Sequence, residues 1–374
     1  MHRAVKIEPF EIERFYDRWE FRAELMLSSS DCESRPVAEL LALESDALER
    51  LTELRLGYTE VAGGDELLGA VAALYERIAP ADVLTLAAAE EGIFIVYHAL
   101  LEPGDHAIVE APCYGSAIAV ARSTGAEVSL WERRWEDGWA HDLQALEQML
   151  RPETKVLYLN SPHNPTGTQM PPQQLERLVA MLSEREIVLF SDEVYRGLEH
   201  DPADRLPAAC DLYEHAISLN TVSKSYGLPG LRIGWLACRD ATRLRRIREL
   251  KLYTTICSSA PSEVLVALAL RHSERLIEEN RRLLVSNLAL IEEFLGRHEE
   301  LFEWVHPTAG PIGFPRVRDG RDVTAWCERT AEQAGVLLLP GSVYEQPRHV
   351  RLGFGRRSLP EAIERLESHL AAGG

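Results

Sequence analysis

A single lysine, Lys224, stands in a short stretch whose other side chains could grip a dianionic phosphate. Hydroxyl groups at Thr221 and Ser223 precede it, and the guanidinium of Arg232 follows it. Hydroxyl and guanidinium groups are good partners for phosphate oxygens. A lysine held beside such a phosphate is placed to condense with an aldehyde. A lone lysine in a Ser/Gly turn is ordinarily a solvated surface residue, but this spacing favours the chemical interpretation.

A carboxylate at the end of an apolar run is the second chemical signal. Residues 187–190 predict a buried strand, which leads into Asp192. An unpaired buried charge is costly, so Asp192 needs a partner. The simpler alternative for a single aspartate is a helix N-cap.

Two loops at predicted strand ends supply further candidates. The run 155–159 leads into the loop 160–167, with the sequence Asn-Ser-Pro-His-Asn-Pro-Thr-Gly, and the run 106–110 leads to Tyr114. Loops after the carboxyl ends of parallel strands are where such sheets bind ligands. The ring of Tyr114 offers a face for stacking, with a plain core aromatic as the equal alternative.

A helix start after another predicted strand could bind phosphate without a charged side chain. Residues 83–86 predict a strand, and a helix is expected to begin near Ala88, Ala89 and Glu90. Free backbone N–H groups and the positive end of the helix dipole favour an anion there. Taken alone, these residues are only an alanine-rich helix start.

Together these stretches resemble the class I/II aminotransferase family, the aspartate aminotransferase-like members of fold-type I pyridoxal-phosphate enzymes. The resemblance runs from about Leu27 to the last predicted helix and implies pyridoxal 5'-phosphate as cofactor. It implies Lys224, Asp192 and Tyr195 as catalytic residues. Asp192 would pair with the protonated pyridine nitrogen of the cofactor and so make its ring an electron sink. The implied cofactor-binding residues are Ala88, Ala89, Glu90, Tyr114, Asn164, Asp192, Tyr195, Thr221, Ser223, Lys224, Arg232 and, reaching from a neighbouring subunit, Tyr58.

The substrate end of the site carries weaker motifs. In the family an arginine in the strand matched by 350–355 pairs with the substrate α-carboxylate, which implies this role for Arg351. A solvent-facing strand residue is the alternative. Asn164 and Ser29 complete the implied substrate site. The segment 28–34 is serine-rich where the family has a glycine-containing loop, so this chain departs from the family there.

The elements that must position these residues alternate between strand and helix. This alternation predicts an α/β fold with a mostly parallel sheet and helices on both faces. The resemblance adds a seven-stranded-type sheet and a smaller α+β domain built from both chain ends. It divides the chain into an N-terminal segment 1–45, a large cofactor domain 46–255 and a connecting helix with the small domain 256–374. Single helices are expected over 37–56 and about 262–296.

Composition narrows the class of protein. The chain has 374 residues and a net charge of −19, which argues against nucleic acid as a partner. Its six cysteines show no metal-binding spacing, so no metal is expected, and they suit a reducing compartment. Neither a signal peptide nor a transmembrane run is recognised. A cytoplasmic enzyme without a membrane partner is therefore expected.

The expected reaction moves an amino group between an L-amino acid and a 2-oxo acid, in a homodimer with shared active sites. Two alternatives remain open. The same fold could act as a lyase or cyclase, such as a C–S lyase or a specialised enzyme of secondary metabolism. A non-catalytic regulator that binds pyridoxal phosphate is the alternative from another class.

Overall fold

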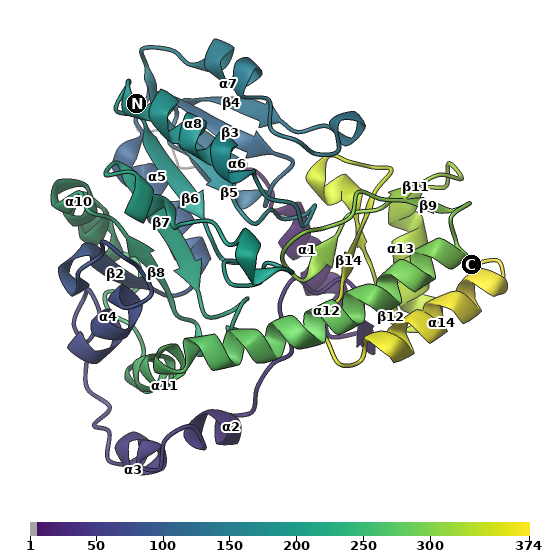
Figure 1. Ribbon diagram of the computed structural model, residues 1–374, viewed down its shortest axis with the longest axis horizontal. Coiled ribbons are helices and arrows are strands. Elements are labelled where there is room, and N and C mark those ends of the chain that lie inside the picture. Colours follow the sequence, from purple (N-terminus) through teal and green to yellow (C-terminus); the bar gives the residue numbers. More distant parts are fainter. Residues whose placement is uncertain (1–5) are drawn as a thin grey trace.

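The computed structural model describes residues 6–374 and centres on a seven-stranded sheet (Figure 1). The strand order is β2–β8–β7–β6–β5–β3–β4; β8 is antiparallel to both neighbours and the other pairs are parallel. The α/β fold class is therefore as predicted, whereas the strand β8 was not predicted. The strands are β2 (Val83–Leu86), β3 (His106–Ala111), β4 (Glu127–Glu132), β5 (Thr154–Asn160), β6 (Val188–Asp192), β7 (Ala216–Thr221) and β8 (Gly234–Ala237).

Helices cover both faces of this sheet because the side chains of each strand point alternately to opposite sides. Val156 and Tyr158 of β5 pack with one helix layer, whereas Leu157 and Leu159 pack with the other. The first layer contains α5 (Ala89–Leu100), α6 (Ser116–Ser123) and α10 (Ala241–Lys251). The second contains α7 (Leu143–Met149), α8 (Pro172–Ser183) and α9 (Ala209–Leu212).

The prediction of a single helix over 37–56 is wrong. Two short helices, α2 (Val37–Leu41) and α3 (Ala47–Thr52), stand there and project from the body (Figure 1). Only Leu40 and Ala47 are buried in them, so no continuous apolar face supports one long helix.

The helix expected over 262–296 is also divided. It breaks at His272 into α11 (Ala260–Arg271) and α12 (Ser273–Arg297). The first part packs beside α4 (Asp65–Ala72) against β2 and β8, while α12 runs away to the second unit of the chain (Figure 1). The two parts serve different cores, and the break lets them take different directions.

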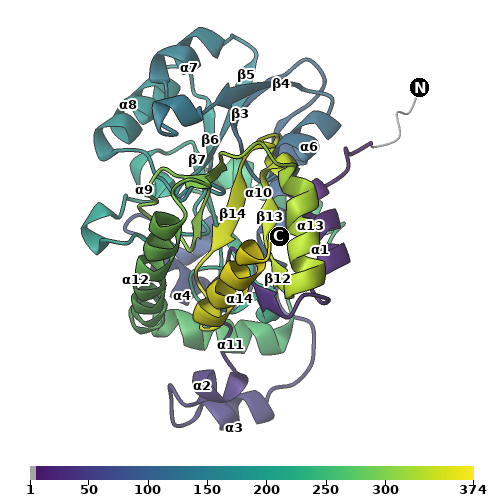
Figure 2. The same ribbon diagram turned by 90° about the vertical axis from the view of Figure 1, so that its right-hand side faces the viewer.

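Both chain ends build the second, smaller unit. In it β1 (Leu25–Met26) pairs with β12 (Val336–Leu337), and β14 (Val350–Gly353) lies between β10 (Ile312–Gly313) and β13 (Leu339–Pro340). Figure 2 shows α13 (Val323–Ala334) and α14 (Leu359–Ala371) beside these strands. The other elements are α1 (Glu11–Trp19), β9 (Phe302–Glu303), β11 (Arg316–Val317) and the 3₁₀ turns Pro80–Asp82, Trp135–Asp137, Pro202–Asp204, Pro229–Leu231 and Gly341–Tyr344.

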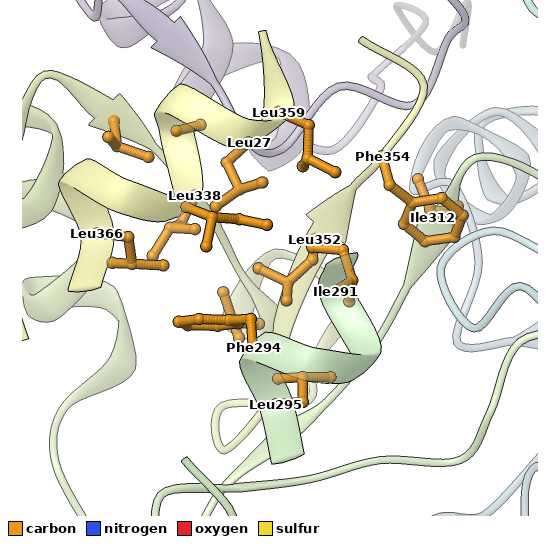
Figure 3. Close-up of a cluster of buried hydrophobic side chains, with 14 of the residues drawn as sticks. Leu27, Ile291, Phe294, Leu295, Ile312, Leu338, Leu352, Phe354, Leu359 and Leu366 are labelled. Carbon is orange, nitrogen blue, oxygen red and sulfur yellow. The ribbon is translucent and has the colours of Figure 1, made fainter. Parts of the chain in front are cut away.

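An apolar core joins the distant parts of this smaller unit. Leu27, Phe294, Leu352 and Leu366 point into one cluster from four separate stretches of chain (Figure 3). The predicted segment 1–45 therefore contributes to the same unit as the C-terminal residues, although residues 1–5 of it lie outside the described part. No helix within residues 6–374 has the length and apolarity that crossing a bilayer requires.

Gly234 lets the unpredicted strand β8 pass close to the start of α5. It is in register with Leu86 of β2 and Thr221 of β7. A Cβ atom at this position would lie 2.9 Å from the carbonyl oxygen of Asn220 and 3.0 Å from the carbonyl carbon of Ala88. Both neighbours are backbone atoms, so they cannot move aside as a flexible side chain would.

We expect Gly234→Ala to lower the free energy of unfolding by about 1–3 kcal/mol, the usual range for overpacking. Urea denaturation measures this loss. Gly230→Ala is the matched control from the same stretch, because no atom lies within 4 Å of a Cβ placed there. Equal stability of the two variants would contradict the close approach of β8 to α5.

Candidate active site

The predicted site residues lie where the parallel strands end. Asp192 is the last residue of β6 and Thr221 is the last residue of β7. Asn160 ends β5 just before the loop that carries Asn164, and Ala111 ends β3 just before Tyr114. Because the carboxyl ends of parallel strands share one edge of the sheet, the fold brings these four stretches together.

Lys224 lies half-buried in a cavity of about 150 Å³ at this edge. Its Nζ atom donates a hydrogen bond to the hydroxyl of Ser30, at 2.9 Å. Burial lowers the pKa of the Lys224 ammonium, although the nearby carboxylate of Asp31 opposes this. Ser29, Tyr114 and the guanidinium-bearing Arg351 line the same cavity. A nucleophilic amine and a buried cation thus face one small space.

The guanidinium of Arg351 is 1% exposed and is held by neutral oxygens only. It donates to the carboxamide oxygen of Asn164 (3.1 Å), the hydroxyl of Tyr16 (2.6 Å), the carbonyl of Ser28 (2.8 Å) and the hydroxyl of Tyr344. No carboxylate pairs with it within residues 6–374, and its Nε atom has no hydrogen-bond partner there. A buried cation without a counterion is a strong binding site for a carboxylate.

Asp192 is buried as well, and its own partners are neutral. Its carboxylate accepts hydrogen bonds from the hydroxyl of Tyr158 (2.8 Å) and the backbone N–H of Val194 (3.2 Å). Burial raises the pKa of Asp192 to about 6. The helix N-cap alternative is wrong, because Asp192 ends a strand and no helix among the described residues begins there.

The whole chain, apart from its ends, matches one family. The profile described as aminotransferase class I and II covers residues 24–366. The chain belongs to this aminotransferase family. It is 32% identical to capreomycidine synthase from Streptomyces vinaceus, over 98% of this chain and 94% of that protein. It is 30% identical to aspartate aminotransferase from Thermotoga maritima, over 87% of this chain and 86% of that protein.

Solved structures give the same result. A PLP-dependent aminotransferase from Streptococcus suis 89-1591 superposes with a TM-score of 0.93 and 32% identity over 98% of both chains. The PLP-dependent cyclase OrfR superposes with a TM-score of 0.92 and 27% identity, covering 100% of this chain and 99% of the other. The predicted family, fold type and pyridoxal-phosphate cofactor are therefore confirmed.

The carboxylate of Asp192 fits the cofactor's pyridine nitrogen. It is a buried acid that forms no ion pair within the described part of the chain, and its pKa is raised by burial. A pyridinium N–H would supply both the missing positive charge and a hydrogen-bond donor. The amine of Lys224 approaches the same edge of the sheet from the end of β7. These two residues therefore suit the two ends of one ring.

The phosphate end fits less completely within a single chain. The hydroxyls of Thr221 and Ser223 lie 3.0 Å apart and are both buried. The first-turn N–H groups of Ala89 and Glu90 have no intrahelical acceptor, as at any helix start. Ala88 just before them has a φ of 74°, a conformation that favours glycine. The backbone thus keeps the glycine-like turn although the residue is alanine.

The side chains of Arg232, Tyr58 and Glu90 point away from the phosphate end in the single chain, which leaves the predicted backbone N–H group of Glu90 in place. Arg232 is exposed and its Nη1 atom donates to the carbonyl of Pro229 at 3.0 Å. Tyr58 is 94% exposed, and its role toward a neighbouring subunit stays a prediction. The carboxylate of Glu90 accepts from the hydroxyl of Ser116 at 2.9 Å, and burial raises its pKa to about 7. A raised pKa reduces the repulsion that a phosphate nearby would meet.

Tyr114 and Tyr195 take up positions that suit their predicted roles. The ring of Tyr114 lines the cavity beside Lys224, and its hydroxyl donates to Glu13 at 2.5 Å. Tyr195 is 1% exposed, and burial raises its pKa, so its phenol stays protonated and able to donate. Their contacts with the cofactor stay predictions.

The side chains of four residues that were not predicted bind Lys224, Asp192 or Arg351. Ser30 binds Lys224, Tyr158 binds Asp192, and Tyr16 and Tyr344 hold Arg351. Ser29, the predicted member of the serine-rich segment, lines the cavity, but Ser30 makes the contact with the lysine. Tyr158 stands two residues before the end of β5, and this place beside a strand end could have marked it. Ser30 belongs to the serine-rich segment 28–34, whereas nothing local in the sequence marks Tyr16 or Tyr344.

We expect Asp192→Asn to stabilise the cofactor-free protein at pH 8. The raised pKa means that folding favours protonated Asp192, so its contribution to stability is fully present below the ordinary pKa of an aspartate and is lost as pH rises through about 6. The difference between those two pKa values corresponds to about 3 kcal/mol at pH 8. Thermal unfolding from pH 4 to pH 8 measures the gap between variant and wild type, which should close toward pH 4.

Bound pyridoxal phosphate should instead make the wild type the more stable protein, since a carboxamide at position 192 could not form the ion pair with the pyridine nitrogen. Cofactor titration followed by fluorescence should show weaker binding to Asp192→Asn. A variant that binds as tightly as the wild type would contradict the pairing of Asp192 with the pyridine nitrogen.

Proposed function

We propose that this chain uses pyridoxal phosphate to move the α-amino group of an L-amino acid to a 2-oxo acid. The observation that carries the proposal is that Lys224, which bears a primary amine, and Arg351, which bears a guanidinium without a counterion, line one cavity. Membership of the aminotransferase family supports the same reaction.

Each residue's role follows from its charge and surroundings. Arg351 binds the substrate carboxylate because its guanidinium lacks a counterion and its Nε hydrogen is free to donate; a bidentate pair also requires a carboxylate oxygen to displace one of the neutral acceptors of Nη1 or Nη2. The lowered pKa of Lys224 makes its amine easier to deprotonate, so it can take the proton from the substrate's α-carbon. Asn164 uses its carboxamide oxygen on Arg351 and Tyr344, which leaves its amide hydrogens to donate. When bound, pyridoxal phosphate supplies an electron sink for charge at that carbon.

Cyclisation of an amino acid is the second candidate. Capreomycidine synthase aligns over more of this chain and of its own length than the aspartate aminotransferase does. The cyclase OrfR superposes over the full length. Both reactions begin with loss of the α-proton, so the same roles for Lys224 and Arg351 support either outcome.

The assembly and location are proposals of the same kind. A homodimer is supported by exposed apolar side chains on one stretch of chain, with Leu56 81% and Tyr58 94% exposed. A cytoplasmic location is supported by six cysteines without a disulfide, five of them buried. The net charge of −19 suits neither a nucleic acid nor an acidic membrane surface as a partner.

The division into 1–45, 46–255 and 256–374 is likewise a proposal, supported by the shared core of both chain ends.

We expect Lys224→Ala to lower the rate of amino-donor conversion by at least about a thousandfold, because the variant lacks both the cofactor's attachment point and the base. Single-turnover absorbance of the cofactor band measures this. Lys155→Ala, a change of an exposed lysine on β5, is the matched control. Partial recovery with added methylamine would identify the missing group as an amine. Undiminished turnover by Lys224→Ala would exclude its role.

Product analysis separates the two candidate reactions. With an α-¹⁵N-labelled donor and pyruvate, transamination places the label in alanine and yields a 2-oxo acid. A cyclase instead keeps the label in a product derived from the donor and needs no 2-oxo acid. We expect label in alanine. Label found only in a cyclic amino acid would favour the second candidate.

A further inference from the structure

Two carboxylates without cationic partners stand over the cavity that holds Lys224. Glu13 lies in α1 and Glu20 directly follows that helix, and both line the cavity. Within residues 6–374, the carboxylate of Glu13 accepts only from the hydroxyl of Tyr114, and that of Glu20 has no hydrogen bond or ion pair. Both residues are exposed at the mouth of the cavity.

These acids share a helix face with a residue that binds Arg351. Glu13, Tyr16 and Glu20 are spaced by three and four residues, which places them on one side of the helix. The hydroxyl of Tyr16 accepts from Arg351 at 2.6 Å. One helix therefore presents a neutral hydroxyl to the carboxylate-binding cation and negative charge to the remainder of the cavity.

The other charges at the cavity form one matched pair and two cations, Lys224 and Arg351, that have no carboxylate partner within residues 6–374. Asp31 and Arg356 form an ion pair with nitrogen–oxygen distances of 2.9 and 3.0 Å. The buried and unneutralised Arg351, 1% exposed with its Nε unpartnered within residues 6–374, calls for a ligand carboxylate in the same cavity. A substrate bound there by its carboxylate leaves Glu13 and Glu20 as the charges that its side chain meets.

We propose that the site selects amino acids with a cationic side chain, an ammonium or a guanidinium, through Glu13 and Glu20. This inference rests on the proposed function, and it names the class of substrate that the same cavity binds. Partial burial, together with the charges of Asp31 and Glu13, raises the pKa of Glu20, and a positive side chain would relieve that repulsion. An acidic side chain would meet two carboxylates and find Arg356 already engaged by Asp31.

L-arginine and L-citrulline test the proposal, because they have nearly the same shape and differ in the charge of the side chain. Calorimetry on the cofactor-loaded protein measures binding, and the single-turnover rate constant divided by the dissociation constant measures use. We expect a preference for arginine of about tenfold, falling to about twofold in the double variant Glu13→Gln/Glu20→Gln. Citrulline binding should stay unchanged in that variant.

Glu11→Gln is the matched control, since it removes one negative charge from the same helix outside the cavity. It should keep the full preference for arginine. Equal binding of arginine and citrulline by the wild type would overturn the proposal, and so would a preference that the double variant retains. If Glu11→Gln lost the preference for arginine as fully as the double variant does, the proposal would be overturned too. The preference would then depend on the long-range charge of the helix and not on Glu13 and Glu20.

The two proposals fail separately. If arginine binds more tightly than citrulline and the double variant abolishes that difference, the substrate class holds even where no amino group is transferred. If neutral amino acids are converted as efficiently as arginine and lysine, the aminotransferase reaction stands and the selection by Glu13 and Glu20 is wrong.

Discussion

The buried guanidinium of Arg351 links distant stretches of the chain. Its acceptors come from α1, from the segment after β1, from the loop after β5 and from the turn before β14. Taking a cation out of water is costly, and four neutral oxygens compensate for only part of the lost hydration. The remaining charge is the basis of the proposed carboxylate binding at this site. The same set of bonds fixes the smaller unit against the large sheet at the edge where Lys224 lies.

A second buried network holds the loops that carry Tyr114 and Asn164. Glu110, at 0% exposure, accepts from Arg133 (3.0 Å), His141 (2.7 Å) and the backbone N–H of Asn160 (2.8 Å). Although burial opposes it, the neighbouring His163, His141 and Arg133 hold the pKa of Glu110 below its ordinary value. Such a satisfied network fixes the loop geometry, because loss of Glu110 or Arg133 leaves the other's buried charge unpaired, and loss of another member leaves a buried polar atom without a partner.

His163 ties these two loops together directly. Its Nε2 atom donates to the carbonyl of Pro112 at 2.8 Å, and its other ring nitrogen bonds to Thr166 at the same distance. Burial lowers the pKa of His163 to about 3, so the ring stays neutral near pH 7. The loop that carries Asn164 thus has a fixed relation to the loop that carries Tyr114, without adding a charge behind the site.

The amino-acid sequence by itself determined the parallel sheet, the cofactor and the residues at the strand ends, because each of these is written in contiguous residues. Apolar runs specify strands, and Lys224, Asp192 and Asn164 follow such runs directly. Only the tertiary structure decided where α11 and α12 separate, that Gly234 begins an antiparallel strand, and that Ser30, Tyr16 and Tyr344 meet Lys224 and Arg351. The contact of Tyr16 with Arg351 joins residues 335 positions apart and that of Ser30 with Lys224 joins residues 194 positions apart, and no local pattern encodes a partner that only tertiary packing brings within hydrogen-bond distance.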